Sequence, residues 1–357
     1  MEKNMLKILT NYIHSKPLKM ITYEEYMDIV LYHPQYGYYM REKEKIGTKG
    51  DFITTSNYSD IMGSLFAKWF EKMIKKYALP AVFCEVGAGT GRFARAFMEE
   101  WYKEKRTDLT YIIIEKSPYH IKQQSEQFDP RWNVKYVKSL EELKELSGMV
   151  FSNELFDAFP VHVIEKRENQ LFEVMIGMEN GQLIEHLVPL NNRDILTFID
   201  DYQLTLVEGQ RIEICLKMEE MISQISQVLQ KGLVVTIDYG YTQEEWKEPL
   251  RKDGSLRGYY QHRLKTDLLS NPGEMDITSH IHWDVLEQMG GKYDLKKINR
   301  WRQHEFFIHI GILEELKNHQ DLDPFSETNK LNRAIRSLIM PQGISDAFQV
   351  LLQQKKL

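Results

Sequence analysis

The sequence predicts a doubly wound α/β fold, in which a mostly parallel sheet carries helices on both faces. Two observations predict it. Short apolar runs alternate with helix-like stretches through the middle of the chain, and the first of these runs ends in a glycine-rich turn. Such alternation is typical of βαβ units, which build parallel sheets. With 357 residues the chain is long enough for one such core and additional segments.

The first 75 residues are predicted to form a helical cap before this core. Thr22 followed by Glu25 is a capping-box pattern, which marks the start of a helix. Apolar residues recur at helical spacing through 59–75. We therefore expect an N-terminal helical region at 1–75.

Five apolar runs predict the strands of the sheet, and a helix is expected between the last two of them. The runs span residues 81–87, 109–115, 134–137, 149–155 and 232–240. Strands that alternate with helices along the chain are expected to lie parallel in one sheet. The core is therefore expected over 76–316.

Two segments interrupt the alternation. The first, 161–190, contains NQ and ENG turn signals and predicts an antiparallel β excursion. The second, 241–276, shows no clear period, and its Arg257–Tyr260 stretch is expected to be a loop near the substrate. The last segment, 317–357, is expected to be a helical tail.

Composition narrows the class of protein. The net charge of −6 gives the whole molecule no attraction to nucleic-acid phosphates. The two cysteines, Cys84 and Cys215, favour a reducing compartment without a disulfide framework. No stretch approaches the roughly 18 apolar residues of a membrane helix, and the N-terminus lacks secretory and mitochondrial targeting patterns. We expect a cytoplasmic protein without a nucleic-acid or membrane partner, and the sequence leaves the oligomeric state open, with a homodimer as one possibility.

The strongest local signal for a ligand is a glycine-rich loop at the end of the first run. It contains Glu85, Gly87, Ala88, Gly89 and Gly91 in the form E-x-G-x-G-x-G. Glycines at a strand-to-helix turn allow the backbone to approach a ligand closely. The loop is therefore predicted to bind a cofactor.

The acid that follows the second run supports this prediction. Glu115 lies 26 residues after Gly89, where an acid accepts hydrogen bonds from ribose hydroxyls. A dinucleotide fingerprint would place glycine or alanine at Arg92. The loop instead resembles motif I of class I S-adenosylmethionine (SAM)-dependent methyltransferases. A dinucleotide cofactor, or a turn without any ligand, are the alternatives.

Further motifs resemble those of the MidA-like methyltransferases, the family of a mitochondrial complex I assembly factor that methylates arginine. The resemblance runs nearly end to end and is carried by ITYEEYM, HPQYGYY, GTKGDFITTS, EVGAGTG, SNELFDAFPV, TIDYGY, EMDITSHIHW and IMPQGISDAFQVL. It implies a Rossmann-like class I methyltransferase core, SAM as cofactor, S-adenosylhomocysteine as product, and a protein arginine as methyl acceptor.

Candidate catalytic residues follow the fourth run. Glu154 and Asp157 stand where the strand ends of an α/β sheet face the ligand crevice, and Asn153 beside them can contact cofactor or substrate. A guanidinium stays protonated in water, so an enzyme that methylates it needs carboxylates to hold it and accept its proton. The alternative roles are a turn cap for Glu154 and a solvent-exposed position for Asp157.

Further candidates lie elsewhere. Asp51 is predicted to cover the cofactor, with a local turn hydrogen bond as the alternative. Asp238 ends the fifth run and is a candidate on the substrate side. A helix is expected to begin near Thr278, with Asp276 and Thr278 as its N-terminal groups, and His280 is expected to line the substrate site. The x-His-x-His spacing with one carboxylate lacks a zinc pattern, so no metal is expected.

The function predicted from these residues is SAM-dependent methyl transfer to a protein arginine. The alternatives are methylation of a small molecule or of another protein residue, and an assembly protein that binds SAM without catalysis. A nicotinamide oxidoreductase is a further alternative. A protein substrate is the expected partner.

Overall fold

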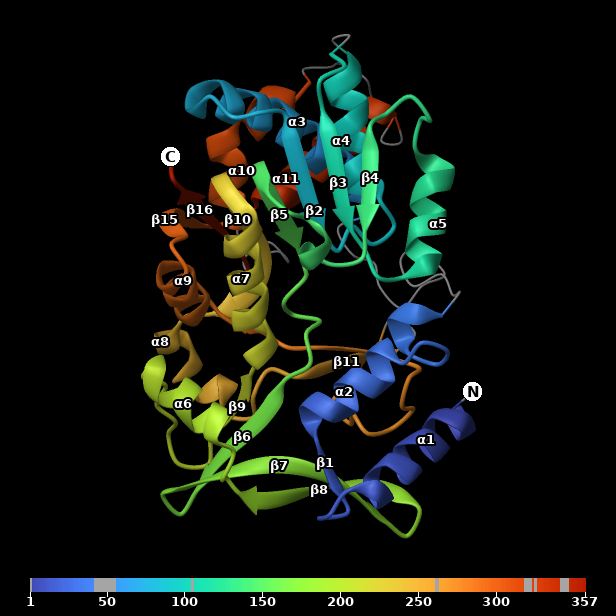
Figure 1. Ribbon diagram of the computed structural model, residues 1–357, viewed down its shortest axis with the longest axis vertical. Helices are drawn as coiled ribbons and strands as arrows, with labels where there is room; N and C mark the ends of the chain where they lie inside the picture. Colours follow the sequence, from blue (N-terminus) through green and yellow to red (C-terminus); the bar gives the residue numbers. More distant parts are fainter. Residues whose placement is uncertain are drawn as a thin grey trace. The chain divides into compact units, whose positions relative to one another are not determined.

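The chain folds into two compact units in the computed structural model (Figure 1). Unit 1 comprises Met1–Ile53, Phe156–Met221 and Gly240–Met289, and unit 2 comprises Thr54–Leu155, Ile222–Tyr239 and Gly290–Leu357. The structure describes residues 2–41, 56–103, 106–260, 263–317, 323, 326–340 and 347–357.

Unit 2 is built around a predominantly parallel sheet, whose strands Figure 1 shows side by side. The five predicted strands are confirmed within it. The strands are β2 (Val82–Val86), β3 (Thr110–Ile114), β4 (Val134–Val137), β5 (Leu146–Asn153), β10 (Leu229–Tyr241), β15 (Lys296–Arg302) and β16 (Phe348–Lys355). Most positions of β2, β3 and β5 are buried, as expected for parallel strands covered on both faces.

The order of these strands defines a doubly wound fold. It runs β15-β16-β10-β5-β2-β3-β4, so the strands numbered in chain order lie as 3-2-1-4-5-7-6. β4, β3, β2, β5 and β10 are parallel, and β16 is antiparallel to both of its neighbours. The direction of winding reverses between β2 and β5, where ligands bind in open α/β sheets. This confirms the predicted fold class.

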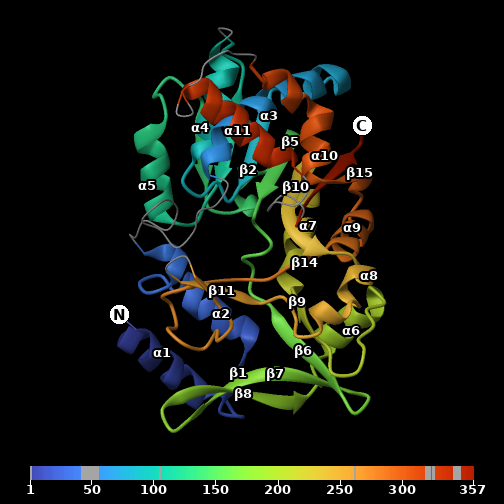
Figure 2. The same cartoon turned by 180° about the vertical axis from the view of Figure 1, so that it is seen from behind.

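One face of this sheet carries the main hydrophobic core of unit 2. The core joins buried residues of the strands, such as Phe83, Phe151 and Val235, to those of four helices. These helices are α3 (Ser56–Tyr77), α4 (Arg92–Lys103), α10 (Gln303–Ile310) and α11 (Glu327–Ile339). Figure 2 shows α11 lying across this face. The helix α5 (Pro118–Gln127) and the short helices η2 (Leu140–Glu142) and η4 (Ile312–Glu315) complete the unit.

The end of the chain differs from the predicted helical tail. After α11, the last described segment is the strand β16, which pairs with both β10 and β15. Phe348, Val350 and Leu352 face the core, while Leu351 is buried on the other face. A strand buried on both faces has no alternating pattern, so its apolar run can be mistaken for part of a helix.

Unit 1 contains two antiparallel sheets. The larger has the order β1-β7-β6-β9, with β8 paired to β7. Its strands are β1 (Met20–Thr22), β6 (His162–Arg167), β7 (Gln170–Glu179), β8 (Gln182–Pro189) and β9 (Arg211–Ile214). The antiparallel excursion predicted at 161–190 is thereby confirmed. The smaller sheet has the order β12-β11-β13.

The smaller sheet corrects two predictions. β11 (Arg257–Tyr260) is a strand between β12 (Arg263–Lys265) and β13 (Asp276–Thr278), so the expected loop at 257–260 is wrong. The expected helix start near Thr278 is also wrong. β14 (Ile281–His282) follows, and α9 begins only at Trp283 and ends at Lys292. The residues at 257–260 and 276–278 form strands because they pair with each other across the sheet. Such pairing leaves no periodic signal in strands this short.

The helices of unit 1 begin with α1 (Glu2–Ser15) and α2 (Tyr23–Tyr32). The capping box of α2 is confirmed, since Thr22 accepts a hydrogen bond from the Glu25 N–H and Glu25 accepts one from the Thr22 N–H. The others are η1 (Tyr38–Met40), α6 (Arg193–Asp201), α7 (Leu216–Val228, shared with unit 2), α8 (Gln243–Trp246) and η3 (Pro249–Arg251).

The domain boundaries predicted at 75/76 and 316/317 stay a prediction, and the two compact units divide the chain differently.

Candidate active site

The glycine-rich loop connects β2 to α4 at the point where the winding of the sheet reverses. The Gly91 N–H donates to the Ala88 carbonyl at 2.9 Å, which closes a tight turn. Gly89 and Gly91 have φ angles of +51° and +77°, a conformation that glycine adopts without steric cost. Among the described residues, no atom would lie within 4 Å of a Cβ atom added to Gly89. The loop therefore offers open space beside Gly89.

Glu85 lies in β2 just before the loop and is buried. One of its carboxylate oxygens accepts a hydrogen bond of 2.6 Å from the Tyr111 hydroxyl on the neighbouring strand β3. Burial raises the pKa of Glu85 to about 7, because the low-dielectric interior disfavours its charged form. A cation placed beside it would favour the carboxylate.

Glu115 follows β3 at the same edge of the sheet. Its Oε1 atom accepts a hydrogen bond of 2.8 Å from the Ser117 N–H, and its Oε2 atom lies 3.6 Å from His120 Nδ1. Ser117 caps α5. The carboxylate is thus held by the first turn of the helix that follows it.

Asn153 and Glu154 end β5. Glu154 has a φ angle of +49°, which is uncommon for a residue with a side chain. Its N–H donates to the Ile237 carbonyl of β10 at 2.9 Å, and its Oε1 atom accepts a 3.2 Å hydrogen bond from the Asn153 amide. Strained conformations of this kind cluster at functional sites.

Asp238 lies beside this pair and is fully buried. The register pairs Ile237 with Asn153, so Asp238 follows at the level of Glu154. Its Oδ1 atom accepts a 2.9 Å hydrogen bond from the Tyr239 N–H. The parallel registers therefore bring the loop, Glu115, Glu154 and Asp238 to one edge of the sheet.

Two predicted catalytic residues, Asp157 and His280, belong to unit 1. The Asp157 side chain is buried, and its carbonyl accepts a 2.9 Å hydrogen bond from the Ser279 N–H. The His280 ring stacks on Tyr241 at 4.6 Å between ring centroids. Burial lowers the pKa of His280 to about 4, so its imidazole is neutral at pH 7.

The polar residues around His280 were missed by sequence reasoning. The His280 N–H donates to Ser255 Oγ at 2.8 Å, and Ser255 Oγ donates to Glu213 at 2.6 Å. In the same unit, the Tyr39 hydroxyl donates to Asp276 at 2.5 Å. These pairs join residues 25, 42 and 237 positions apart, so no local pattern could reveal them.

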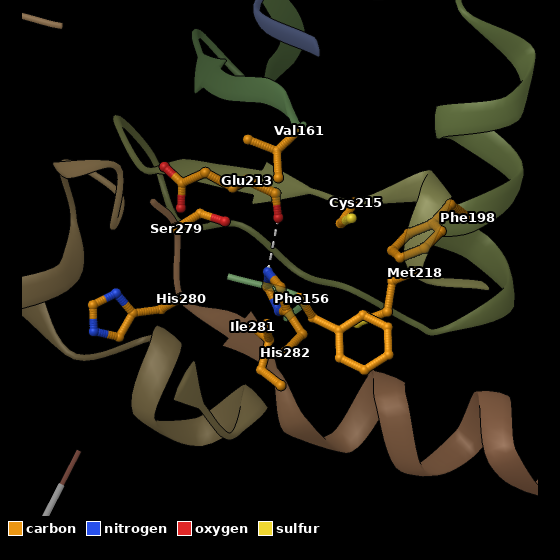
Figure 3. A pocket seen from close by; sticks show the side chains of 10 residues that line it. All are labelled: Phe156, Val161, Phe198, Glu213, Cys215, Met218, Ser279, His280, Ile281 and His282. Atoms are coloured by element: carbon orange, nitrogen blue, oxygen red, sulfur yellow. Dashed lines mark hydrogen bonds between the residues drawn. The ribbon is translucent and has the colours of Figure 1, made fainter. Parts of the chain in front are cut away.

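A small pocket lies in unit 1 beside this network (Figure 3). Its walls include the apolar side chains of Phe156, Phe198 and Met218, with Ser279 and His280 among its polar lining. Its lining otherwise consists of Val161, Glu213, Cys215, Ile281 and His282. The dashed line in Figure 3 marks the 3.0 Å contact between His282 Nε2 and the Glu213 carbonyl oxygen.

Asp51, predicted to cover the cofactor, lies outside the described residues. The described residues contain no group of three or more His, Cys, Asp or Glu side chains that could hold a metal ion. None of the described helices is long and apolar enough to span a membrane.

The order of the strands and the position of the glycine-rich loop are those of a doubly wound protein that binds a cofactor. Comparisons with known proteins identify its family. Residues 65–299 match a family described as "Putative S-adenosyl-L-methionine-dependent methyltransferase". The match covers more than half of the chain, so the chain belongs to this family of SAM-dependent methyltransferases.

Curated relatives extend over most of the chain. The rat "Protein arginine methyltransferase NDUFAF7, mitochondrial" is 27% identical and covers 92% of this chain and 79% of its own length. The Xenopus tropicalis protein of the same name is 25% identical and covers 83% of this chain and 73% of its own length.

A solved structure supports the fold. A protein of Burkholderia thailandensis, crystallised with S-adenosyl-homocysteine, matches with a TM-score of 0.89 and 22% identity, over 99% of this chain and 92% of that chain. At this identity the likeness shows the fold alone.

The predicted cytoplasmic localisation is contradicted by these relatives. Both curated relatives are mitochondrial proteins, which points to mitochondria instead. Localisation depends on short targeting signals and not on the fold or the overall composition. The prediction used the cysteine content and the pattern of the N-terminal residues, and neither determined the localisation.

Proposed function

We propose that this methyltransferase transfers the methyl group of SAM to a side-chain nitrogen of an arginine in a protein substrate. The names of the relatives support the acceptor, since the rat and Xenopus tropicalis proteins are protein arginine methyltransferases. The observation that carries the proposal within the fold is Glu154. It is a carboxylate on strained backbone, at the edge of the sheet where the cofactor loop also lies.

The residues at this edge of the sheet suit different parts of the SAM molecule. The open space at Gly89 admits the amino acid part of the ligand, and Glu85 can attract its cationic groups. Glu115 suits the ribose hydroxyls. The predicted cofactor residues are Asp51, Glu85, Gly87, Ala88, Gly89, Gly91, Glu115 and Asn153.

Glu154 is proposed to contact the methyl acceptor. Bound SAM supplies an electrophilic methyl group. The new bond forms between an arginine nitrogen and the methyl carbon, the carbon–sulfur bond breaks with its electron pair going to sulfur, and the nitrogen loses a proton. Because free arginine keeps its proton up to a pKa above roughly 12, Glu154 would orient the guanidinium and receive this proton. Most of the gain in rate would come from alignment.

Asp157, Asp238 and His280 stay predicted catalytic residues. Asp238 shares the strand edge with Glu154. Asp157 is a buried carboxylate and His280 a half-buried neutral base. Asp238 is proposed to contact the acceptor beside Glu154, while the catalytic roles of Asp157 and His280 in unit 1 stay predictions. Asp238→Asn, Asp157→Asn and His280→Gln test each role separately.

The experiment that tests the function uses the full chain with SAM carrying a tritiated methyl group. A mitochondrial protein extract and its small-molecule fraction serve as acceptors, and Glu154→Gln is the control. We expect label in methylated arginine after acid hydrolysis of the protein fraction. Label in small molecules or in another amino acid would contradict the proposed acceptor. Binding of SAM without any transfer would support a non-catalytic protein.

A further inference from the structure

Gln124 of α5 is buried beneath the glycine-rich loop. Its side chain is fully buried, and its amide Nε2 donates a 2.6 Å hydrogen bond to the Gly89 carbonyl. The two residues are 35 positions apart in the chain. A buried amide therefore holds the central peptide of the loop from the side of α5.

The packing around this bond is close. A Cβ atom added to Gly91 would lie 2.6 Å from Cγ of Gln124 and 3.1 Å from the Phe128 ring. The loop can approach α5 to this distance only because residue 91 is glycine. The side chain of Gln124 is thus confined between the helix and the loop.

The hydrogen bond determines which way a backbone donor points. In a trans peptide the C=O and the following N–H point in opposite directions. When Gln124 draws the Gly89 carbonyl toward α5, the Thr90 N–H of the same peptide points away from α5. The neighbouring Gly91 N–H is already used by the Ala88 carbonyl.

We infer that Gln124 is a positioning residue for the cofactor. It holds the Gly89–Thr90 peptide so that the Thr90 N–H can receive the carboxylate of the amino acid part of SAM. Backbone N–H groups at such turns suit anions. The inference rests on the proposed cofactor site, and it assigns Gln124 to one part of the ligand.

The chain offers a matched control. Gln353 of β16 is also fully buried, and its Nε2 donates to a backbone carbonyl, that of Leu295, at 3.2 Å. In both glutamines the side-chain oxygen has no hydrogen-bond partner among the described residues. Replacing either by methionine removes one buried hydrogen bond at similar volume, but only Gln124 contacts the loop.

The test measures binding of two ligands to the full-length protein by calorimetry. S-adenosylhomocysteine carries the amino acid part, and 5′-methylthioadenosine lacks it. For Gln124→Met we expect the Kd of S-adenosylhomocysteine to rise about tenfold, with the Kd of methylthioadenosine within about twofold of wild type. Gln353→Met should leave both Kd values within about twofold. Gln124→Leu, which also removes the donor, should repeat the selective loss.

The outcomes separate the two claims. Equal affinity of Gln124→Met and wild type for S-adenosylhomocysteine, or an equal loss for both ligands, would overturn the role of Gln124. Failure of the wild-type protein to bind S-adenosylhomocysteine would instead refute the cofactor site itself. Thermal unfolding of both methionine variants checks that any loss of affinity does not reflect loss of the fold.

Discussion

Two buried acids, one in each unit, differ in how their charge is accommodated. Glu213 of β9 in unit 1 accepts hydrogen bonds from the Ser255 N–H and hydroxyl and from the Leu256 N–H. Among the residues that the structure describes, Glu85 of β2 in unit 2 accepts one, from the Tyr111 hydroxyl. Burial raises the pKa of both carboxyl groups.

This difference in hydrogen bonding indicates a different role for each of the two acids. Glu213 is surrounded by donors from its own chain, so it ties β9 to the segment before β11. Glu85 keeps capacity to accept further hydrogen bonds or a cation at the edge of the sheet. A buried carboxyl with few donors costs stability, and the position of Glu85 beside the glycine loop fits a role in binding.

The largest effect is expected at the edge of the sheet in unit 2. Glu154→Gln should lower the rate of methyl transfer about 10³-fold, since a neutral amide neither attracts a guanidinium nor takes its proton. The Kd for S-adenosylhomocysteine should stay within about twofold of wild type. Single-turnover assays with tritiated SAM and calorimetry measure the two quantities.

The corresponding change in unit 1 is the control. Glu213→Gln, whose side chain reaches His280 only through Ser255, should lower the rate per folded molecule far less than Glu154→Gln does. If it lowers transfer as much as Glu154→Gln does, the contrast between a binding edge and a structural acid fails.

Replacing a buried glutamate by glutamine should raise the free energy of unfolding at Glu85 and lower it at Glu213. Because Glu85 binds a proton more readily when folded, its contribution is lost as pH rises from about 4.5 to about 7. At pH 8 Glu85→Gln should therefore raise the free energy of unfolding by up to about 3 kcal/mol. Glu213→Gln places an amide against N–H donors and should lower it by about 2 kcal/mol.

Denaturant titrations of the ligand-free proteins at pH 8 measure both changes. A loss of stability in Glu85→Gln at this pH would mean that Glu85, like Glu213, is satisfied within the protein.

A third pair compares glycines of the two units. Gly89 has a φ angle of +51° and Gly181, in the hairpin between β7 and β8, has one of +80°. No described atom would contact a Cβ at either position. Alanine at each should cost about 1 kcal/mol of stability through backbone strain. Only Gly89→Ala should weaken S-adenosylhomocysteine binding, by about thirtyfold, because its methyl group occupies the proposed ligand space.

Calorimetry and thermal unfolding of the two alanine variants measure these effects. Equal affinities in Gly89→Ala and Gly181→Ala would exclude ligand contact at Gly89.

The smallest expected effect is the pH dependence of SAM binding. As pH rises through about 7, Glu85 loses its proton and can attract the cationic ligand. The affinity of the wild-type protein for SAM should therefore rise by up to about tenfold between pH 6 and pH 8. Glu85→Gln should show a flat profile, while Glu213→Gln keeps that of wild type. A slope that survives in Glu85→Gln would assign the titration to another group.

The cofactor edge was largely predictable from the sequence, because its residues follow the strands directly. Apolar runs predict the strands, and the carboxyl ends of parallel strands meet at one edge, so Gly89, Glu115 and Glu154 were found by position. The structure confirms their common edge, while their roles stay proposals. Gln124 was not found, since nothing near it in the sequence marks its contact with Gly89.

Unit 1 was less predictable. Its short strands β11, β13 and β14 carry no clear period, and the segment was expected to contain a loop and a helix start. The pairing of Arg257 with Thr278 makes both segments strands, and this contact joins residues 21 positions apart.

By itself, the sequence determined the order of strands and helices in the core, the place of the glycine loop and the family, because these follow from local periodicity and from residues adjacent in the chain. The tertiary structure alone decided that β16 completes the sheet, that Tyr111 contacts Glu85, and that Gln124 holds Gly89. These contacts depend on which segments pack together, and burial and hydrogen bonding between distant residues leave no local pattern.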